Sequence, residues 1–225
     1  IAGLSEAELE RGVICASAGN HAQGVALAAA RRNAASTIVM PTTTPAIKIA
    51  AVRALGGDVV LYGDSFDAAY AHARELEAKT GAVFIHPFDD PDVIAGQGTV
   101  GLEIARQHAD PIEAVFVPIG GGGLAAGVAA IIKFLRPETL VIGVEPVDAP
   151  TMRSAINAGE VVTLNEVGLF ADGVAVRRAG AATFDLCKSL LDDVILVDTD
   201  AICAAIKDIF DDSRAIAEPS GAVAL

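Results

Sequence analysis

The fold is decided by residues 114–135, which read AVFVPIGGGGLAAGVAAIIKFL. Residues 114–117 form an apolar run typical of a buried strand, and the Ala/Leu/Ile-rich residues 124–135 are typical of a helix. The four glycines Gly120–Gly123 between them form a loop without side chains. Such a loop lets a ligand touch the backbone, and it exposes unpaired N–H groups at the positive end of the helix dipole. The stretch therefore predicts a phosphate-binding turn, since a purely structural turn needs only one or two glycines.

The composition excludes several classes of protein. A hydrophobic content of 52% with 20% charged residues rules out a disordered chain, and 225 residues suffice for one large domain or two smaller ones. The net charge of −13, without any basic run, argues against nucleic acid and against anionic membranes as partners. Gly120–Ile132, the longest apolar stretch, is too short to cross a membrane. Cys15, Cys187 and Cys203 are too scattered for a disulfide framework or a zinc site, so we expect three buried free thiols in a reducing cytoplasm.

Apolar strands and amphipathic helices alternate along the chain, which predicts an α/β protein with parallel twisted sheets and helices on both faces. We expect strands at 13–16, 37–40, 59–62, 83–85, 114–117, 140–144 and 194–197. We expect helices at 20–32, 46–55, 65–80, 95–108, 124–135, 151–157, 181–191 and 200–212. Ser65 is expected to be an N-cap, and Pro45 to stand at a first helical position.

The Pro- and Asp-rich residues 86–92 predict a crossing point between two parts of the chain. We expect a small lobe at residues 1–90 and a larger lobe at residues 91–225. The chain opens without Met directly before the helix signature Ser5–Leu9, and it stops in an apolar stretch without a capping residue. We therefore expect a segment of a longer protein, in which both lobes are incomplete.

A second candidate site follows the first expected strand, where residues 16–24 read ASAGNHAQG. Ligands of open α/β sheets bind at this edge of the sheet. Ser17, Asn20 and His21 gather hydrogen-bonding groups around a helix N-terminus, which is a suitable environment for a carboxylate or a phenolate. From these residues alone, the alternative that Ser17 or Asn20 only caps the helix is equally good.

These motifs resemble those of a known enzyme family. The stretches SAGNHAQG (17–24), PIGGGGL (118–124) and AEPSGA (217–222) are similar to the catalytic domain of biosynthetic threonine dehydratases, which are fold-type II pyridoxal-phosphate enzymes. Residues 38–41, 94–99, 168–176 and 197–205 are similar to the same family in the same order. The resemblance implies three-layer α/β/α lobes, pyridoxal phosphate as cofactor, and a carbon–nitrogen lyase of isoleucine biosynthesis that converts L-threonine to 2-oxobutanoate and ammonia.

The resemblance also implies roles for individual residues. The cofactor phosphate is assigned to Gly120, Gly121, Gly122, Gly123 and Leu124. The cofactor ring is assigned to Asn20, which contacts its ring oxygen, and to Gly173 and Glu218 beside it. The substrate carboxylate is assigned to Ser17, Ala18, Gly19 and His21. The implied partners are a small amino-acid substrate and further copies of the chain, as a dimer or tetramer in the cytoplasm, and we expect the two loops to face each other across a cleft between the lobes.

The residue that would bond covalently to the cofactor is missing. The family's lysine lies in a Ser-Phe-Lys-x-Arg-Gly-Ala motif, which is absent here, as are its downstream Ser-Gly-Ala-Asn motif and its isoleucine-binding regulatory domain. The five lysines all fall in or at the end of expected helices, where solvated faces are their expected place: Lys48, Lys79, Lys133, Lys188 and Lys207. We therefore expect no catalytic lysine in this chain, no activity of the chain alone, and phosphate or sulfate as an alternative occupant of the glycine loop.

Three alternatives stay open. Serine racemases and serine dehydratases share both loops, although residues 168–176 favour the threonine enzyme. Eukaryotic racemases also bind a divalent cation where Glu145 matches the first ligand, but Thr151 replaces the last acidic ligand, so we expect no metal. Gly120, Gly122 and Ala125, with Glu145 after the next strand, also fit a loose fingerprint of an NAD-binding oxidoreductase. The last alternative is a non-catalytic fragment that binds a partner.

Overall fold

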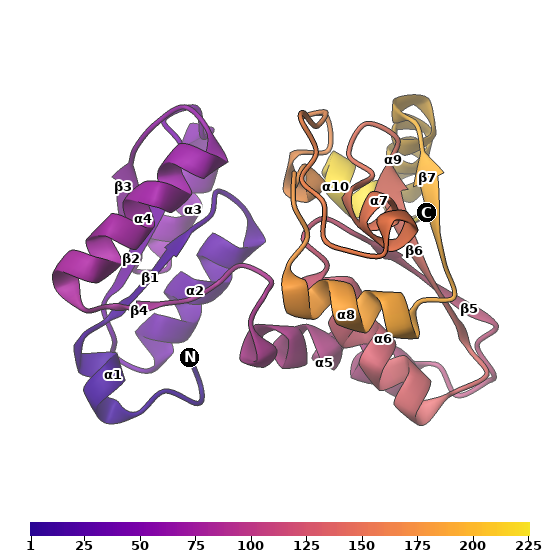
Figure 1. Ribbon diagram of the computed structural model, residues 1–225, viewed down its shortest axis with the longest axis horizontal. Helices are drawn as coiled ribbons and strands as arrows, with labels where there is room; N and C mark the ends of the chain where they lie inside the picture. The colour runs from indigo at the N-terminus through magenta and orange to yellow at the C-terminus, as the bar shows by residue number, and fades with distance from the viewer. The chain divides into compact units, whose positions relative to one another are not determined.

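The computed structural model describes residues 1–225 as two compact units, Ile1–Pro87 and Phe88–Leu225 (Figure 1). The division falls after Pro87, three residues before the expected lobe boundary. Each unit contains one sheet, and every strand pair in both sheets is parallel, which confirms the α/β fold class. No helix combines the length and the apolar composition needed to span a bilayer.

The first unit has a four-stranded sheet in the order β3-β2-β1-β4. Its strands are β1 (Val13–Ala16), β2 (Ser36–Met40), β3 (Asp58–Leu61) and β4 (Val83–Phe84). Its helices are α1 (Glu6–Glu10), α2 (Asn20–Arg31), α3 (Ala46–Ala54) and α4 (Phe66–Thr80). The central strand β1 pairs on one side with β2, where Cys15 lies opposite Ile38, and on the other side with β4. The strand order reverses between β1 and β4, which is where open α/β sheets bind their ligands.

Successive residues of β1 and β2 point to opposite faces of this sheet and form two separate cores. One core includes α2 and α3, and its strand residues are Val13, Cys15, Ile38 and Met40. The other core includes α4, and its strand residues are Ile14, Ala16 and Val39. Because both faces are covered, the strands are apolar throughout instead of alternating with polar residues.

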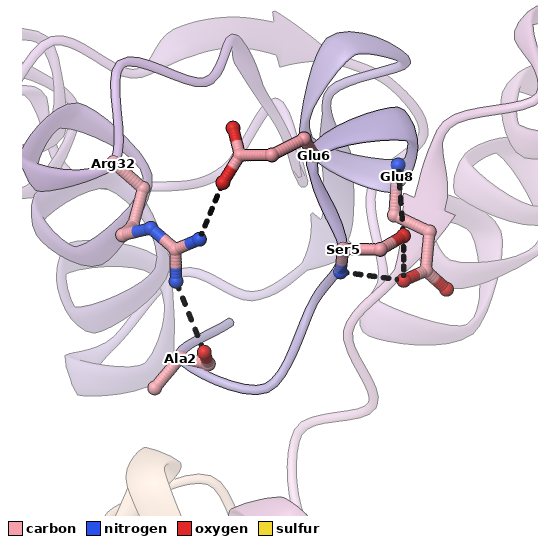
Figure 2. Close-up of polar contacts among 5 residues, drawn as sticks. All are labelled: Ala2, Ser5, Glu6, Glu8 and Arg32. Atoms are coloured by element: carbon pink, nitrogen blue, oxygen red, sulfur yellow. Dashed lines mark hydrogen bonds and ion pairs between the residues drawn. The ribbon is translucent and has the colours of Figure 1, made fainter.

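Helix α1 is held by a capping box at its N-terminus and by contacts with Arg32 (Figure 2). Ser5 and Glu8 form a capping box, in which the Ser5 N–H donates to Glu8 Oε2 at 2.8 Å and the Glu8 N–H donates to Ser5 Oγ at 3.4 Å. Arg32, just after α2, donates to the Ala2 carbonyl at 3.0 Å and pairs with Glu6 at 3.3 Å. The predicted helix signature at Ser5–Leu9 is therefore confirmed, and Arg32 ties it to the end of α2.

The second unit has a three-stranded sheet in the order β5-β6-β7. Its strands are β5 (Ala114–Pro118), β6 (Leu140–Pro146) and β7 (Asp193–Val197). Its helices are α5 (Pro91–Gln107), α6 (Gly123–Leu135), α7 (Thr151–Ala158), α8 (Ala181–Leu190), α9 (Thr199–Ser213) and α10 (Pro219–Ala222), with a short 3-10 turn η1 (Asp172–Val174). The predicted irregular stretch 161–179 holds only η1 and one bridge, between Thr163 and Arg178.

Helices α5 and α6 lie side by side in Figure 1, and glycines bring their backbones together. A Cβ atom on Gly127 of α6 would lie 2.4 Å from the Ile94 carbonyl oxygen of α5. Gly98 and Gly101 of α5 face α6 in the same way, with backbone oxygens of α6 at 3.2 and 3.1 Å from their Cβ positions. This contact buries α6, which carries the glycine loop at its N-terminus.

Several expected positions need correction. Helix α5 begins at Pro91, four residues before the expected start, because the Asp90 side chain accepts hydrogen bonds from Asp92 and Val93 and caps it. Pro45 is the N-cap of α3 and not its first helical residue, since its backbone is extended with ψ at 140°. Cys203 is exposed, because the face of α9 that packs on the protein carries Ile202 and Ala205, and Cys203 lies on the face toward solvent.

Candidate functional site

The glycine loop joins β5 to α6 in the second unit. The Ile119 N–H donates to the Val144 carbonyl at 2.9 Å, which extends the pairing with β6 up to the loop. Gly120 and Gly121 form the turn, Gly122 is the N-cap with a φ of 98°, and Gly123 is already the first residue of α6. A positive φ of this size favours glycine at position 122. Strand β5 thus ends one residue later, and helix α6 begins one residue earlier, than the sequence predicts.

Each glycine of the loop also has a packing reason that the sequence does not reveal. A Cβ atom on Gly121 would lie 2.3 Å from ring carbons of Phe88, and one on Gly123 would lie 3.0 Å from Phe88 Cβ. A Cβ atom on Gly122 would lie 2.8 Å from Met152 Cε and 2.9 Å from Thr183. The missing side chains therefore make room for neighbouring residues of the protein, and not only for a ligand.

Two carbonyl groups of the loop, those of Gly121 and Gly122, are bound, whereas its amides are not. Gly121 O accepts hydrogen bonds from Thr183 Oγ1 at 2.7 Å and from the Gly180 N–H at 3.3 Å. Gly122 O accepts from the Ala126 N–H at 2.9 Å and from Cys187 Sγ at 3.8 Å. The amides from Gly121 to Ala125 have no hydrogen-bond partner. Free amides at the N-terminus of a 13-residue helix suit an anion such as a phosphate group.

Two further predicted residues lie close to this loop in the same unit. A Cβ atom on Gly120 would lie 3.0 Å from Val174 Cα, so the loop touches the turn η1. The Gly173 N–H donates to Ser220 Oγ at 2.8 Å, and a Cβ atom on Gly173 would lie 3.6 Å from Glu218 Oε1. The structure thus brings Gly120, Gly173 and Glu218 into one neighbourhood, in which Glu218 is exposed.

The second predicted loop follows β1 in the first unit. The Ser17 N–H donates to the Val39 carbonyl at 3.1 Å, and Ser17 Oγ accepts from the Gly19 N–H at 3.2 Å. The half-buried Ala18 lies between these two residues. Gly19 is the N-cap of α2 without any side-chain cap, and the exposed side chain of Asn20 makes no hydrogen bond. Neither Ser17 nor Asn20 is therefore the N-cap of α2. The Asn20 side chain stays available there, and the Ser17 hydroxyl, which accepts from the Gly19 N–H, keeps its proton as a donor.

His21 fixes this loop to the neighbouring strand end. Its Nε2 lies 3.1 Å from the Ile85 carbonyl just after β4, at the point where the strand order reverses. A carbonyl only accepts, so Nε2 carries the proton and Nδ1 remains an acceptor. Burial lowers the pKa of His21, although the hydrogen bond to Ile85 opposes this shift. The ring is consequently neutral at pH 7. That the Asn20 loop and the glycine loop share one ligand stays a prediction.

Glu145 has a structural role, which argues against the two other roles considered for it, as a ligand of a metal ion or of a ribose. Its carboxylate is fully buried and accepts hydrogen bonds from the Met152 N–H at 2.7 Å and the Arg153 N–H at 2.9 Å, so it caps α7. Thr151 Oγ1 is bound to the Val176 carbonyl. A ribose would have to displace these amides from Glu145, which removes the support for the dinucleotide interpretation. No group of His, Cys, Asp and Glu side chains is arranged to hold a metal ion.

The positions of the lysines and of two cysteines do not favour a reactive side chain. All five lysines are in helices, but Lys133 departs from the expected solvated face, because it pairs with Asp192 at 2.7 Å and is only 20% exposed. Cys15 and Cys187 are buried as expected, and burial raises the pKa of each thiol to about 12. These two thiols are therefore unreactive at neutral pH.

Comparisons with known proteins agree with this geometry. The chain is 60% identical over 220 residues to the biosynthetic L-threonine dehydratase of Burkholderia multivorans, and 57% identical over 225 residues to that of Escherichia coli. These alignments cover 96% and 100% of the chain but 43% and 44% of the relatives, so the chain spans less than half of their length.

Solved structures show the same relationship. The processed threonine deaminase isoform 2 of Solanum lycopersicum matches with a TM-score of 0.95 and 59% identity, over 99% of this chain and 65% of that one. Maize serine racemase matches with a TM-score of 0.93 and 37% identity, over 98% of this chain and 66% of that one. The family model described as "Pyridoxal-phosphate dependent enzyme" matches residues 1–225. The chain therefore belongs to the family of pyridoxal-phosphate dependent enzymes.

Proposed function

We propose that this chain is the catalytic part of an enzyme that dehydrates and deaminates L-threonine to 2-oxobutanoate and ammonia. The observation that carries the proposal is the glycine loop, whose Gly121 and Gly122 carbonyls are bound to α8 while its amides are free. Identity of 56–60% to biosynthetic threonine dehydratases supports threonine, whereas the maize serine racemase is only 37% identical. Serine racemization or serine deamination is the second candidate, because that fold matches nearly the whole chain.

The residues present fit a pyridoxal phosphate. Free amides from Gly121 to Leu124, at the positive end of the α6 dipole, suit the doubly charged phosphate. Asn20 is exposed without a partner, so its amide is free to donate to the ring oxygen. Gly173 lies beside Glu218 and in the neighbourhood of Gly120. Because it has no side chain, it leaves room there, whereas a Cβ atom at this position would meet Ser220. When bound, the cofactor supplies the electron sink for the charge left on the α-carbon after its proton departs.

The residues from Ser17 to His21 are proposed to bind and orient the substrate. The free N–H groups at the start of α2 and the Ser17 hydroxyl suit a carboxylate. His21 is held by the Ile85 carbonyl, and its neutral ring presents Nδ1 as an acceptor without adding charge. Carboxylate binding here would fix the α-carbon of the substrate, so that the departing proton and the β-hydroxyl are oriented before reaction.

Asn20 provides the test of this proposal, in the full-length protein that contains this chain. The control is Asn157→Ala, because Asn157 is also an exposed helical asparagine. We expect the wild type to form 2-oxobutanoate from L-threonine, measured as its hydrazone. Asn20→Ala should raise the dissociation constant of pyridoxal phosphate by about 10- to 100-fold, because it removes one hydrogen bond to a charged oxygen. Asn157→Ala should change neither the formation of 2-oxobutanoate nor the dissociation constant of pyridoxal phosphate.

Two results would contradict the proposal. Equal cofactor affinity of Asn20→Ala and Asn157→Ala would remove Asn20 from the site. Pyruvate or D-serine from L-serine, without 2-oxobutanoate from L-threonine, would favour the second candidate.

We also propose that the enzyme is a homo-oligomer, a dimer or tetramer, in the cytoplasm. Related biosynthetic enzymes come from bacteria and, under chloroplastic names, from plants. Light scattering coupled to size exclusion would test the assembly, since a single molar mass equal to that of the monomer at micromolar concentration would contradict it. Fractionation of the source cells would test the compartment.

A further inference from the structure

Thr183 is the side chain that holds the centre of the glycine loop. It lies in the first turn of α8 and is completely buried. Its Oγ1 donates to Gly121 O at 2.7 Å and lies 3.3 Å from Gly180 O. The side chain also packs on Gly122, whose Cβ position is 2.9 Å from both Thr183 Cβ and Thr183 Oγ1. A hydroxyl without this carbonyl would be a buried polar group without a strong partner.

The direction of one peptide plane links this hydrogen bond to anion binding. No peptide bond in the chain is cis, and in a trans peptide the C=O of one residue points opposite to the N–H of the next. With Gly121 O held toward α8, the N–H of Gly122 has to point away from α8. The bond from Cys187 Sγ to Gly122 O has the same consequence for the Gly123 N–H, although at 3.8 Å this contact is weaker.

Glycine makes such a constraint necessary. A peptide between two glycines rotates with little steric hindrance, because neither residue carries a Cβ. Without a fixed carbonyl, the Gly121–Gly122 peptide could turn its N–H toward α8 and its C=O toward the anion. A carbonyl oxygen facing a phosphate is repulsive, whereas an amide facing it is attractive.

We propose that Thr183 is a positioning residue for phosphate binding, which aims the Gly122 N–H at the phosphate by fixing the Gly121 carbonyl. The inference rests on the proposed function, because it concerns the same cofactor phosphate. Thr183 does not touch the anion in this arrangement and acts only through the loop. No local motif marks it, since it follows the loop by more than 60 residues.

The experiment uses the full-length protein and three variants. Thr183→Val removes the hydroxyl and keeps the shape of the side chain, and Thr183→Ser restores the hydroxyl. Thr139→Val is the matched control in the same unit, because Thr139 is also buried and donates to a carbonyl, that of Ile112, at 2.8 Å. Dissociation constants of pyridoxal phosphate and of inorganic phosphate are measured by titration calorimetry, and thermal unfolding is followed for each protein.

We expect Thr183→Val to raise both dissociation constants by about tenfold or more, as the loss of one anion-binding amide would do. Thr183→Ser should restore them to within about threefold of the wild type, and Thr139→Val should leave them unchanged even though it lowers the melting temperature. Unchanged affinity in Thr183→Val, or an equal loss in both valine variants, would overturn the inference but not the proposed function. A wild type that binds neither ligand would overturn both.

Discussion

Glu145 provides the sharpest prediction, because it is a fully buried carboxyl group with a shifted pKa. Burial raises its pKa from 4.5 to about 7, while hydrogen bonds from Arg153, Met152 and Thr151 oppose the shift. The informative substitution is Glu145→Gln, because the amide has the same shape as the carboxyl group and cannot ionise. The amide oxygen would accept from one N–H of α7, but the amide NH₂ group would face another N–H and leave it without an acceptor.

Proton linkage gives the direction in which the stability of the folded state changes with pH. A folded-state pKa above the unfolded value means that the folded state binds more protons between the two pKa values. The stabilising contribution of Glu145 is therefore fully present below about pH 4.5, and it is lost as the pH rises through about 7. A difference of about 2.5 pKa units corresponds to roughly 3–4 kcal/mol over the whole pH range, at about 1.4 kcal/mol for each unit.

The measurement is the free energy of unfolding from urea titrations followed by circular dichroism, between pH 5 and pH 8. We expect the difference in this free energy between wild type and Glu145→Gln to fall by about 2–3 kcal/mol between pH 5 and pH 8. Glu145→Ala should show the same fall with a lower stability at every pH, because it also loses the cap of α7. A difference that does not change with pH would show that the amides of α7 compensate the burial, and it would refute the reasoning.

Three substitutions test the supports of the second unit, each by the free energy of unfolding. Gly121→Ala should destabilise by about 1–3 kcal/mol, because its Cβ would overlap the Phe88 ring; no loss would mean that Phe88 moves freely. Asp89→Ala should cost about 1–2 kcal/mol, because the Asp89 carboxylate accepts from three amides at the start of α8; an unchanged value would contradict this cap. Gly96→Ala should stabilise by about 0.5–1 kcal/mol, because a Cβ there meets no atom within 4 Å; a loss would reveal an unrecognised contact.

Local signals predicted the elements well. Strand β1 occupies 13–16 as expected, and Ser65 is the N-cap of α4, with its side chain accepting from the Ala68 N–H. Both depend on residues adjacent in sequence, where apolar runs and capping residues act directly. The late start assigned to α5 shows how composition can mislead. Pro and Asp residues are typical of loops, although Pro91 at the first helical position after Asp90 is also a signal for the start of a helix.

Tertiary contacts account for what the sequence could not predict. Strand β6 continues to Pro146, two residues beyond the expected end, because Glu145 and Pro146 pair with Leu196 and Val197 of β7. The cap formed by Glu145 on α7 likewise depends on a fold that places a strand end under a helix N-terminus. Such partners carry no periodicity or motif that a single sequence could reveal.

The glycine loop shows that a sequence motif can have a packing role in addition to the predicted one. The absent side chains predict space for a ligand, but that space is filled by Phe88, Met152 and Thr183. The groups of the loop that suit an anion are the N–H groups of these peptides, which point away from their bound carbonyls. The carbonyls of Gly121 and Gly122 are bound to α8 and within α6, whereas the amides from Gly121 to Ala125 remain without partners. Close packing on one side and free amides on the other both require glycine, so a run of four satisfies two demands that one or two glycines could not.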